Sequence, residues 1–289
     1  MRSSRVRIAV AIVWALLAGS GCAGSEEPRA PTTSTSAVVG FPNWPPLANG
    51  LRFHWSAEPG IDLLAGSSVA IRAYLESYLL ATVFNSLDAV YPGFWRAVRA
   101  EKENADVLLG NSPVPGVDVY VPTEHGPYRN KPWYGTVFLH LLRVEPTETG
   151  LSARVCYTLQ GLYLVTPEGK YEPSMPEGAT PRLVVKRVDI QDNVGSGGVG
   201  APPDPVAAQR GPMPAPVDDV FGGWVVLGAN SLPVWAGQDG KATLDPETDA
   251  LESRCRQDMQ TPGLQLPPPV LDNPPAIVAP VPGWPAQAG

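Results

Sequence analysis

The chain has few of the residues that usually carry chemistry. Only three cysteines and three histidines occur among its 289 residues. It contains no GxSxG motif of a serine hydrolase, no Walker phosphate-binding loop and no HExxH zinc motif. The cysteines form no CxxC pair, and His54, His125 and His140 are scattered along the chain. The sequence therefore points to no reaction, and we expect neither a metal nor a cofactor.

One glycine motif does occur, because residues 195–200 read GSGGVG and fit the pattern GxGxxG. In a dinucleotide site, this loop opens a helix whose N-terminus meets the pyrophosphate. Here the residues Ala-Pro-Pro-Asp-Pro follow at 201–205, and they cannot begin such a helix in register. We interpret the motif as a loop.

The apolar run at the N-terminus, residues 8–18, is too short to span a bilayer, which needs about 20 residues. It follows Arg2, Arg5 and Arg7, and small residues at 19–21 lead from it to Cys22. These three parts predict an export signal over residues 1–21. Residues 18–22, AGSGC, resemble the lipobox of bacterial lipoproteins, with Gly19 where leucine is usual. The resemblance implies a lipid on Cys22, which would anchor the protein at the outer face of the cytoplasmic membrane.

Removal of the signal takes away three arginines and no acidic residue, so the formal net charge falls from −7 to −10. An acidic surface argues against nucleic acid and against anionic lipid head groups as partners. The membrane is therefore expected to be a partner through the N-terminal lipid only. Cys156 and Cys255 remain after Cys22, and in an exported protein such a pair favours a disulfide over a metal or redox site.

The 34 prolines and 29 glycines crowd into a few segments, and this divides the chain. We expect a flexible tether over residues 22–60, in which residues 41–55 pack back on the domain as an arm. A globular domain should follow over residues 61–238, with inserts at 164–181 and 191–217. Residues 239–289 form a C-terminal extension with a short helix at 247–257 and a proline-rich tail, which we expect to be extended or disordered.

Apolar spacing predicts the elements of that domain. Residues 67–85 have the three- and four-residue spacing of a helix, with Arg72 and Glu76 expected on its outer side. A shorter helix follows Pro92 and Gly93. Strands are expected at 117–121, 136–144, 152–159, 182–190 and 222–229, the second and third forming a hairpin. Helices followed by strands without helical crossovers indicate an α+β domain with an antiparallel sheet.

At this point the residues resemble a known family. The segments YPGFW, PWYGTVFLHL, ARVCYTL and GGWVVL, spread over residues 65–230, are similar to actinobacterial exported lipoproteins with a nuclear transport factor 2-like domain. The resemblance implies a cone-shaped fold in which N-terminal helices pack on a curved antiparallel sheet. It also implies that any pocket lies between the concave face of the sheet and the helices.

Four residues are candidates for lining such a pocket: Tyr74, Tyr78, Trp95 and His140. His140 would be the acid/base residue of an isomerase- or dehydratase-like enzyme if it faced inward, although no carboxylate partner can be assigned to it. Aromatic residues at helical spacing more often belong to an ordinary core than to a ligand site. Our first interpretation is therefore a non-catalytic binding or scaffolding domain, with other envelope proteins or an apolar small molecule as partner. The pocket enzyme is the alternative.

Overall fold

The computed structural model describes residues 40–99, 131–174, 183–192, 207–231, 234–236, 242–244, 247–259 and 269–286. The chain divides into Met1–Ala37 and Val38–Gly289, and all described residues belong to the second unit. Cys22, the glycine motif at 195–200 and the strand expected at 117–121 lie outside the described residues.

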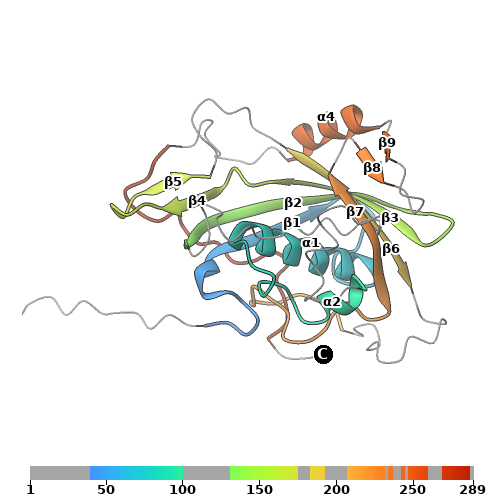
Figure 1. The fold of residues 1–289 in the computed structure, drawn as a ribbon, viewed down its shortest axis with the longest axis horizontal. Helices are drawn as coiled ribbons and strands as arrows, with labels where there is room; N and C mark the ends of the chain where they lie inside the picture. Colours follow the sequence, from blue (N-terminus) through green and yellow to red (C-terminus); the bar gives the residue numbers. More distant parts are fainter. Residues whose placement is uncertain are drawn as a thin grey trace, which may run out of the picture. The chain divides into compact units, whose positions relative to one another are not determined.

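A seven-stranded mixed sheet forms the centre of the described fold (Figure 1). Its strands pair in the order β5-β4-β2-β3-β6-β7, and β1 pairs with β2 in addition. The β1–β2 pair is parallel and all other pairs in this sheet are antiparallel. The strands are β1 Gly50–Ala57, β2 Trp133–Pro146, β3 Leu151–Thr158, β4 Leu162–Val165, β5 Tyr171–Pro173, β6 Val184–Asp192 and β7 Trp224–Ser231.

Helices lie on both faces of this sheet. On one face lie α1, Ser67–Phe84, and the four-residue α2, Phe94–Ala97, while α4, Thr248–Asp258, lies on the other (Figure 1). A short 3-10 helix, η1, spans Pro46–Ala48, and β8, Val234–Ala236, pairs with β9, Ala242–Leu244, in a separate two-stranded sheet. The structure thus confirms the α+β class.

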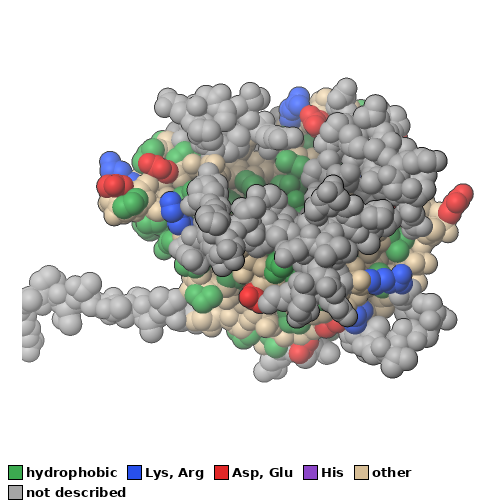
Figure 2. All heavy atoms as spheres, viewed as in Figure 1, with side chains coloured by type: hydrophobic (Ala, Val, Ile, Leu, Met, Phe, Trp, Pro, Cys, Tyr) green, Lys and Arg blue, Asp and Glu red, His purple; other side chains and the backbone are tan. Residues whose placement is uncertain are grey.

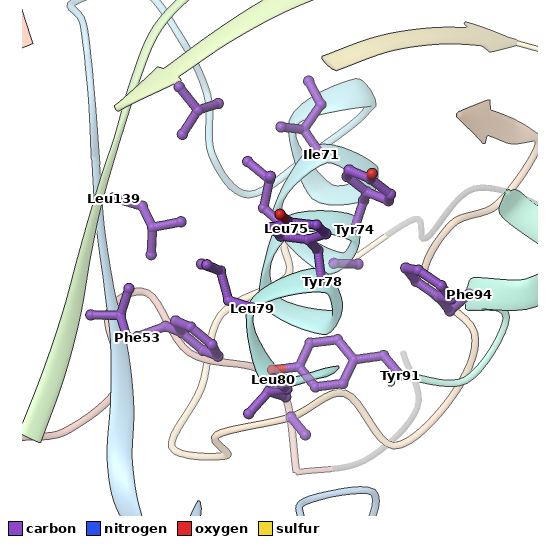
Figure 3. Packing of buried hydrophobic residues seen from close by; sticks show 14 of the residues in the cluster. Phe53, Ile71, Tyr74, Leu75, Tyr78, Leu79, Leu80, Tyr91, Phe94 and Leu139 are labelled. Carbon is purple, nitrogen blue, oxygen red and sulfur yellow. The ribbon is translucent and has the colours of Figure 1, made fainter. Parts of the chain in front are cut away.

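The main core lies between α1 and the sheet. Nearly every residue of α1 is buried, which is expected of a helix that is covered on several sides. From β2, the alternating residues Val137, Leu139 and Leu141 face this core, and Figure 3 shows Leu139 and Phe53 directed toward the helix. The helix ends at Asn85, whose left-handed backbone turns the chain away, a conformation that asparagine adopts more readily than most residues.

The expected hairpin is confirmed, with β2 beginning three residues earlier and β3 ending one residue earlier than predicted. The helix predicted at 67–85 and the strands predicted at 182–190 and 222–229 are confirmed to within two residues.

The predicted domain boundaries are wrong at both ends. The sequence correctly predicts that residues 41–55 pack on the domain, but it places them outside the fold as part of a tether. Residues 50–57 form β1, a strand of the central sheet, and its Leu51, Phe53 and Trp55 are almost completely buried. The sequence places the tail outside the domain, but Trp284 of the tail is only 1% exposed and belongs to the main core. Both segments contain tryptophan among prolines, and burial of the large ring outweighs the low regularity of the surrounding chain.

Neither predicted insert is only a loop. Within residues 164–181, β4 ends and β5 begins, and the β4–β5 hairpin extends the sheet. Within residues 191–217, β6 continues to Asp192, and Gln209, Met213 and Ala215 are buried or pack against the core.

Candidate functional site

The space between α1 and the sheet, where a pocket was expected, is occupied by packed side chains. Tyr74 is fully buried and stacks on Phe94 with ring centroids 5.9 Å apart, and on Tyr78 at 6.4 Å. Trp95 packs partly buried against the same cluster. Tyr74, Tyr78 and Trp95 are therefore core residues and do not line a pocket.

The interior also holds a residue that the sequence does not reveal as a core residue. The ammonium of Lys186 is completely buried and lies 3.9 Å from the centroid of the Tyr78 ring. Strand alternation could have found it, because Lys186 has the parity of Val188 and Ile190, which both face the core. The charge of a lysine suggests that its side chain points to solvent. Here the alternation of side chains along the strand predicts the direction correctly, and the charge does not.

His140 does not belong to this interior. It lies between Leu139 and Leu141, which both face α1, and its partner on β3 is Cys156, whose disulfide reaches α4. His140 therefore points to the opposite face of the sheet from Tyr74, Tyr78 and Trp95. The prediction of a pocket that contains all four side chains is wrong, and with it the assignment of His140 as the acid/base residue of that pocket.

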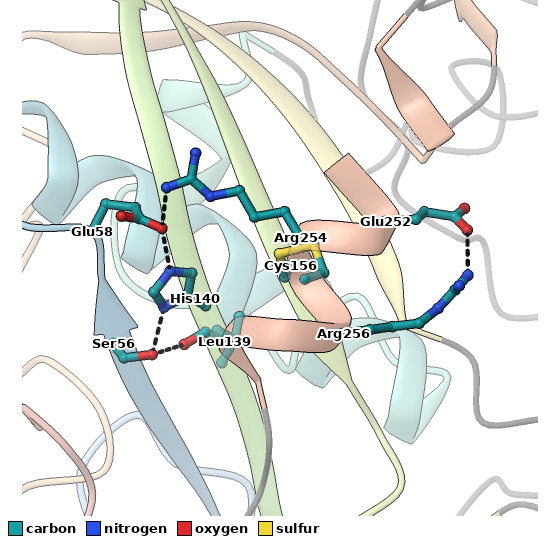
Figure 4. The surroundings of a disulfide bond; sticks show 9 residues. Ser56, Glu58, Leu139, His140, Cys156, Glu252, Arg254 and Arg256 are labelled. Carbon is teal, nitrogen blue, oxygen red and sulfur yellow. Dashed lines mark hydrogen bonds and ion pairs between the residues drawn. A yellow bond between two sulfur atoms is a disulfide. The ribbon is translucent and has the colours of Figure 1, made fainter. Parts of the chain in front are cut away.

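On the outer face, His140 is part of a cluster with Ser56, Glu58 and Arg254 (Figure 4). Its Nδ1 lies 2.8 Å from Ser56 Oγ, and its Nε2 lies 3.5 Å from Glu58 Oε1. Arg254 of α4 places Nη2 at 2.7 Å from the same Glu58 oxygen. Burial alone would raise the pKa of the Glu58 carboxyl, but hydrogen bonds from Arg254 and His140, together with their charges, hold that pKa below its ordinary value.

These residue types also make up a hydrolase triad, in which the carboxylate orients the histidine. Here the nearest partner of the carboxylate is Arg254 rather than His140. The cluster joins β1, β2 and α4. The disulfide between Cys156 and Cys255, which the sequence predicted and the structure confirms, joins α4 to β3, and Cys255 is the residue after Arg254. We therefore interpret the outer cluster as an attachment of α4 to the sheet.

A second charged cluster lies inside the core. Arg72 and Glu76, expected on the outer side of α1, have side chains only 0% and 2% exposed, and Arg72 Nε lies 4.0 Å from Glu76 Oε1. The carboxylate accepts hydrogen bonds from Trp55 Nε1 at 2.7 Å, the Tyr91 hydroxyl at 2.7 Å and Trp284 Nε1 at 2.8 Å. The expectation of an exposed pair is wrong because segments from both ends of the chain cover this side of α1.

Arg72 completes this buried cluster. Its guanidinium donates to the carbonyl oxygens of Leu63, Gln209 and Gly283 at 2.9–3.0 Å. Burial raises the pKa of the Glu76 carboxyl, and the charge of Arg72 and the three hydrogen bonds oppose that rise. Because every partner is a structural element of the fold, the cluster holds segments together.

An apolar groove among the described residues has the size and lining of a ligand site. It encloses about 430 Å³, within the range of about 300–1,000 Å³ that is usual for small-molecule sites. Apolar side chains from the segment before β1 and from the end of α1 form most of its wall, with three polar residues among them. The lining residues are Asn43, Trp44, Pro45, Pro46, Leu47, Phe84, Ser86, Asp88, Ala89 and Val90.

The groove has fixed walls. Trp44 is 5% exposed, and its Nε1 donates to the carbonyl of Ala48, which holds the ring in place. Asn43 donates from Nδ2 to the carbonyl oxygens of Pro216 and Val217 at 3.0 and 2.8 Å, so the groove segment is tied to a distant part of the chain. The site is therefore largely preformed, as binding sites for small molecules usually are.

On the face shown in Figure 2, the described acidic and basic side chains are scattered among apolar and neutral ones, without a patch of one sign. Among the described residues, no group of three or more His, Cys, Asp and Glu side chains could hold a metal ion. In the same part of the chain, no helix combines the length and apolar character needed to cross a membrane. Comparisons with protein-family models, with curated proteins and with solved structures found no match to this chain.

Proposed function

We propose that this chain is an exported, lipid-anchored envelope protein whose nuclear transport factor 2-like domain binds an apolar small molecule without transforming it. The groove at residues 43–47 and 84–90 carries this proposal. The N-terminal signal pattern and Cys22 support the location, and the α+β fold with a helix packed on one face of the sheet is compatible with the family.

The position of the groove in the chain favours an acyl chain as the occupant. Its lining begins at Asn43, and only 20 residues separate that position from Cys22, the expected lipid-bearing residue. Fully extended, those residues reach at most about 70 Å. A groove so close to the anchor would remain within reach of the membrane surface, where acyl chains are the most abundant apolar molecules.

Two observations favour binding over catalysis. The interior between α1 and the sheet is filled by Tyr74, Tyr78 and Phe94, and His140 lies on the other face of the sheet. The polar residues of the groove, Asn43, Ser86 and Asp88, include no histidine, cysteine or lysine. Such a lining suits recognition of an apolar body with a few hydrogen bonds at its edge.

Titration of the mature protein with N-phenyl-1-naphthylamine, a neutral apolar dye, tests the proposal. We expect a saturable rise in dye fluorescence that an added fatty acid reverses. Leu47→Glu and Val90→Glu place a charge on the groove wall and should abolish the rise, because desolvation of a carboxylate is unfavourable.

Ile277→Glu is the matched control, since Ile277 lies in the tail, is 50% exposed and does not line the groove. It should bind the dye as the wild type does. A linear, non-saturating signal, or equal binding by all variants, would exclude the groove as the site.

The location is tested separately by Cys22→Ala. The variant should leave the membrane fraction for the soluble fraction of the envelope, because removal of the acyl chains removes about 0.8 kcal/mol per buried CH₂. If Cys22→Ala still sediments with membranes to the same extent, the anchor is not at Cys22.

A further inference from the structure

The C-terminal segment 281–284, Val-Pro-Gly-Trp, is bound to the rest of the domain in the way a peptide ligand is bound. We infer that β1, α1, Tyr91 and residues 211–213 form a peptide-binding slot for such a segment, and that the tail of a second copy of this chain can fill it in place of the chain's own tail. The residues whose contacts with the segment are described below do not line the apolar groove.

The indole of Trp284 is the anchor of the segment. It is 1% exposed, and its Nε1 donates to Glu76 Oε2 at 2.8 Å. The guanidinium of Arg72 lies over the ring at 4.2 Å from its centroid, and the ring of Tyr91 meets it edge-on at 6.0 Å. A carboxylate for the N–H and a cation for the ring face together select an indole over a phenyl ring, which has no N–H.

On one side, the segment pairs with the edge strand of the sheet. Trp55 N donates to the carbonyl of Val281 at 2.7 Å, and Val281 N donates to the carbonyl of Phe53 at 3.1 Å. The tail thus binds to β1 along its edge, which is how peptides are added to exposed sheet edges in recognition domains. These contacts involve only main-chain atoms of the tail, so they set its direction and register.

On the other side, the segment pairs with residues 211–213. Gly211 N donates to the carbonyl of Pro282 at 3.2 Å, and Met213 and Trp284 exchange two main-chain hydrogen bonds of 2.9 and 3.1 Å. Gly283 has φ +65°, and a Cβ there would lie 2.2 Å from the carbonyl oxygen of Gly211. Only glycine fits at that position, so the slot is specific for both this glycine and the tryptophan that follows it.

The rest of the tail is held loosely by comparison. Val270, Ile277 and Val278 are 54%, 50% and 45% exposed, and outside residues 281–284 the one β-bridge that the structure shows for the described part of the tail joins Leu271 to Tyr171. The contacts of the tail are therefore concentrated in one short segment with one buried anchor. Identical copies can exchange such an element, because the segment forms the same contacts in the slot of either copy. This is the basis of domain swapping.

The test uses the whole mature chain with a specific protease site in place of residues 262–267. The protein is cleaved after folding, so that the tail is present but no longer covalently joined. A fluorescent peptide of residues 269–286 is then added in excess, and its incorporation is followed by anisotropy and by gel filtration. We expect the cleaved tail to co-elute with the domain and the labelled peptide to replace it over time.

Three peptide variants give the specificity. Trp284→Phe should bind about tenfold more weakly, since it loses one hydrogen bond to a charged group. Trp284→Ala should not be incorporated at all. Ile277→Ser, at an exposed position of the tail, should be incorporated like the wild-type peptide.

Several outcomes would overturn the inference. They are a cleaved tail that never exchanges over days, equal incorporation of all peptides, or loss of the circular dichroism of the fold on cleavage, which would show that the domain does not stay folded without a covalently joined tail. The uncleaved protein provides a second measurement. Two differently labelled preparations, mixed at high concentration, should form a mixed dimer that Trp284→Ala abolishes, and strictly monomeric behaviour at every concentration would contradict exchange between copies.

Discussion

The chain pairs an arginine with a glutamate on both faces of the same sheet, and the two pairs differ chiefly in burial. Arg72 and Glu76 lie inside the core with side chains 0% and 2% exposed, and they contact segments from both ends of the chain. Arg254 and Glu58 meet on the outer face at 2.7 Å, with side chains 54% and 20% exposed. The outer pair is the closer one.

Distance is therefore a poor guide to what each pair contributes. In water the attraction between two charges is weak and the ordering of long side chains opposes it, so exposed pairs stabilise little. Inside the core, each charge depends on its partners because water cannot replace them. We expect the buried pair to control the stability of the fold and the outer pair to affect only the attachment of α4.

Glu76→Gln should have the largest effect. The amide keeps one acceptor oxygen and directs an NH₂ group at the donors on the other side. Either Trp55, which donates to Oε1, or Tyr91 and Trp284, which donate to Oε2, therefore lose their hydrogen bonds, and Arg72 loses its counter-charge. Loss of one partner of a buried pair costs about 3–5 kcal/mol. Urea denaturation of the mature domain, followed by tryptophan fluorescence, measures the change.

Glu58→Gln is the matched substitution on the outer face. It should leave the urea midpoint within experimental error of the wild type. Equal destabilisation by Glu76→Gln and Glu58→Gln would show that burial does not separate the two pairs.

Replacement of both Cys156 and Cys255 by serine should have the next largest effect. The disulfide closes a separation of 99 residues and joins β3 to α4. Removal of a disulfide from an exported domain typically costs about 2–5 kcal/mol. The loss should be measured by thermal unfolding against the oxidised wild type, and an unchanged unfolding temperature would mean that the outer ion pairs are enough to hold α4.

The pH dependence should show a smaller effect with a defined sign. Burial raises the pKa of Glu76 above its ordinary value of 4.5. Ionisation of this carboxyl is therefore less favourable in the folded state than in the unfolded state, so the unfolding free energy of the wild type should be highest below pH 4.5 and should fall as the pH rises through the pKa of the folded state. The advantage of the wild type over Glu76→Gln in unfolding free energy should shrink from pH 4.5 upward, and an advantage that grows with pH would contradict a raised pKa for Glu76.

The sequence was a good guide where the pattern is local and regular. The spacing of Ile71, Tyr74, Leu75 and Tyr78 defines α1, and the long alternating run of β2 defines the hairpin. The pair of cysteines, in a chain expected to be exported, predicted the disulfide, which the structure confirms. Each of these inferences depends either on residues close together in the sequence or on the pairing of two cysteines.

It was a poor guide where the outcome depends on distant segments. Arg72 and Glu76 look like a solvent-exposed pair, and only the arrival of Trp55 and Trp284 makes them buried. The groove could not be predicted for the same reason, because its walls come from residues 43–47 and 84–90. The proline-rich tail was predicted to lie outside the domain, whereas Trp284 within it is 1% exposed and belongs to the main core.

The occupancy of the groove is the claim on which the functional account depends, and native mass spectrometry of the mature protein, extracted from its own envelope without added lipid, tests it most directly. Besides the lipid expected on Cys22, we predict one non-covalently bound apolar ligand with the mass of an acyl-containing molecule, lost in Leu47→Glu and retained in Ile277→Glu. A wild-type protein without a dissociable ligand, or a dissociable ligand that Leu47→Glu still retains, would contradict the account.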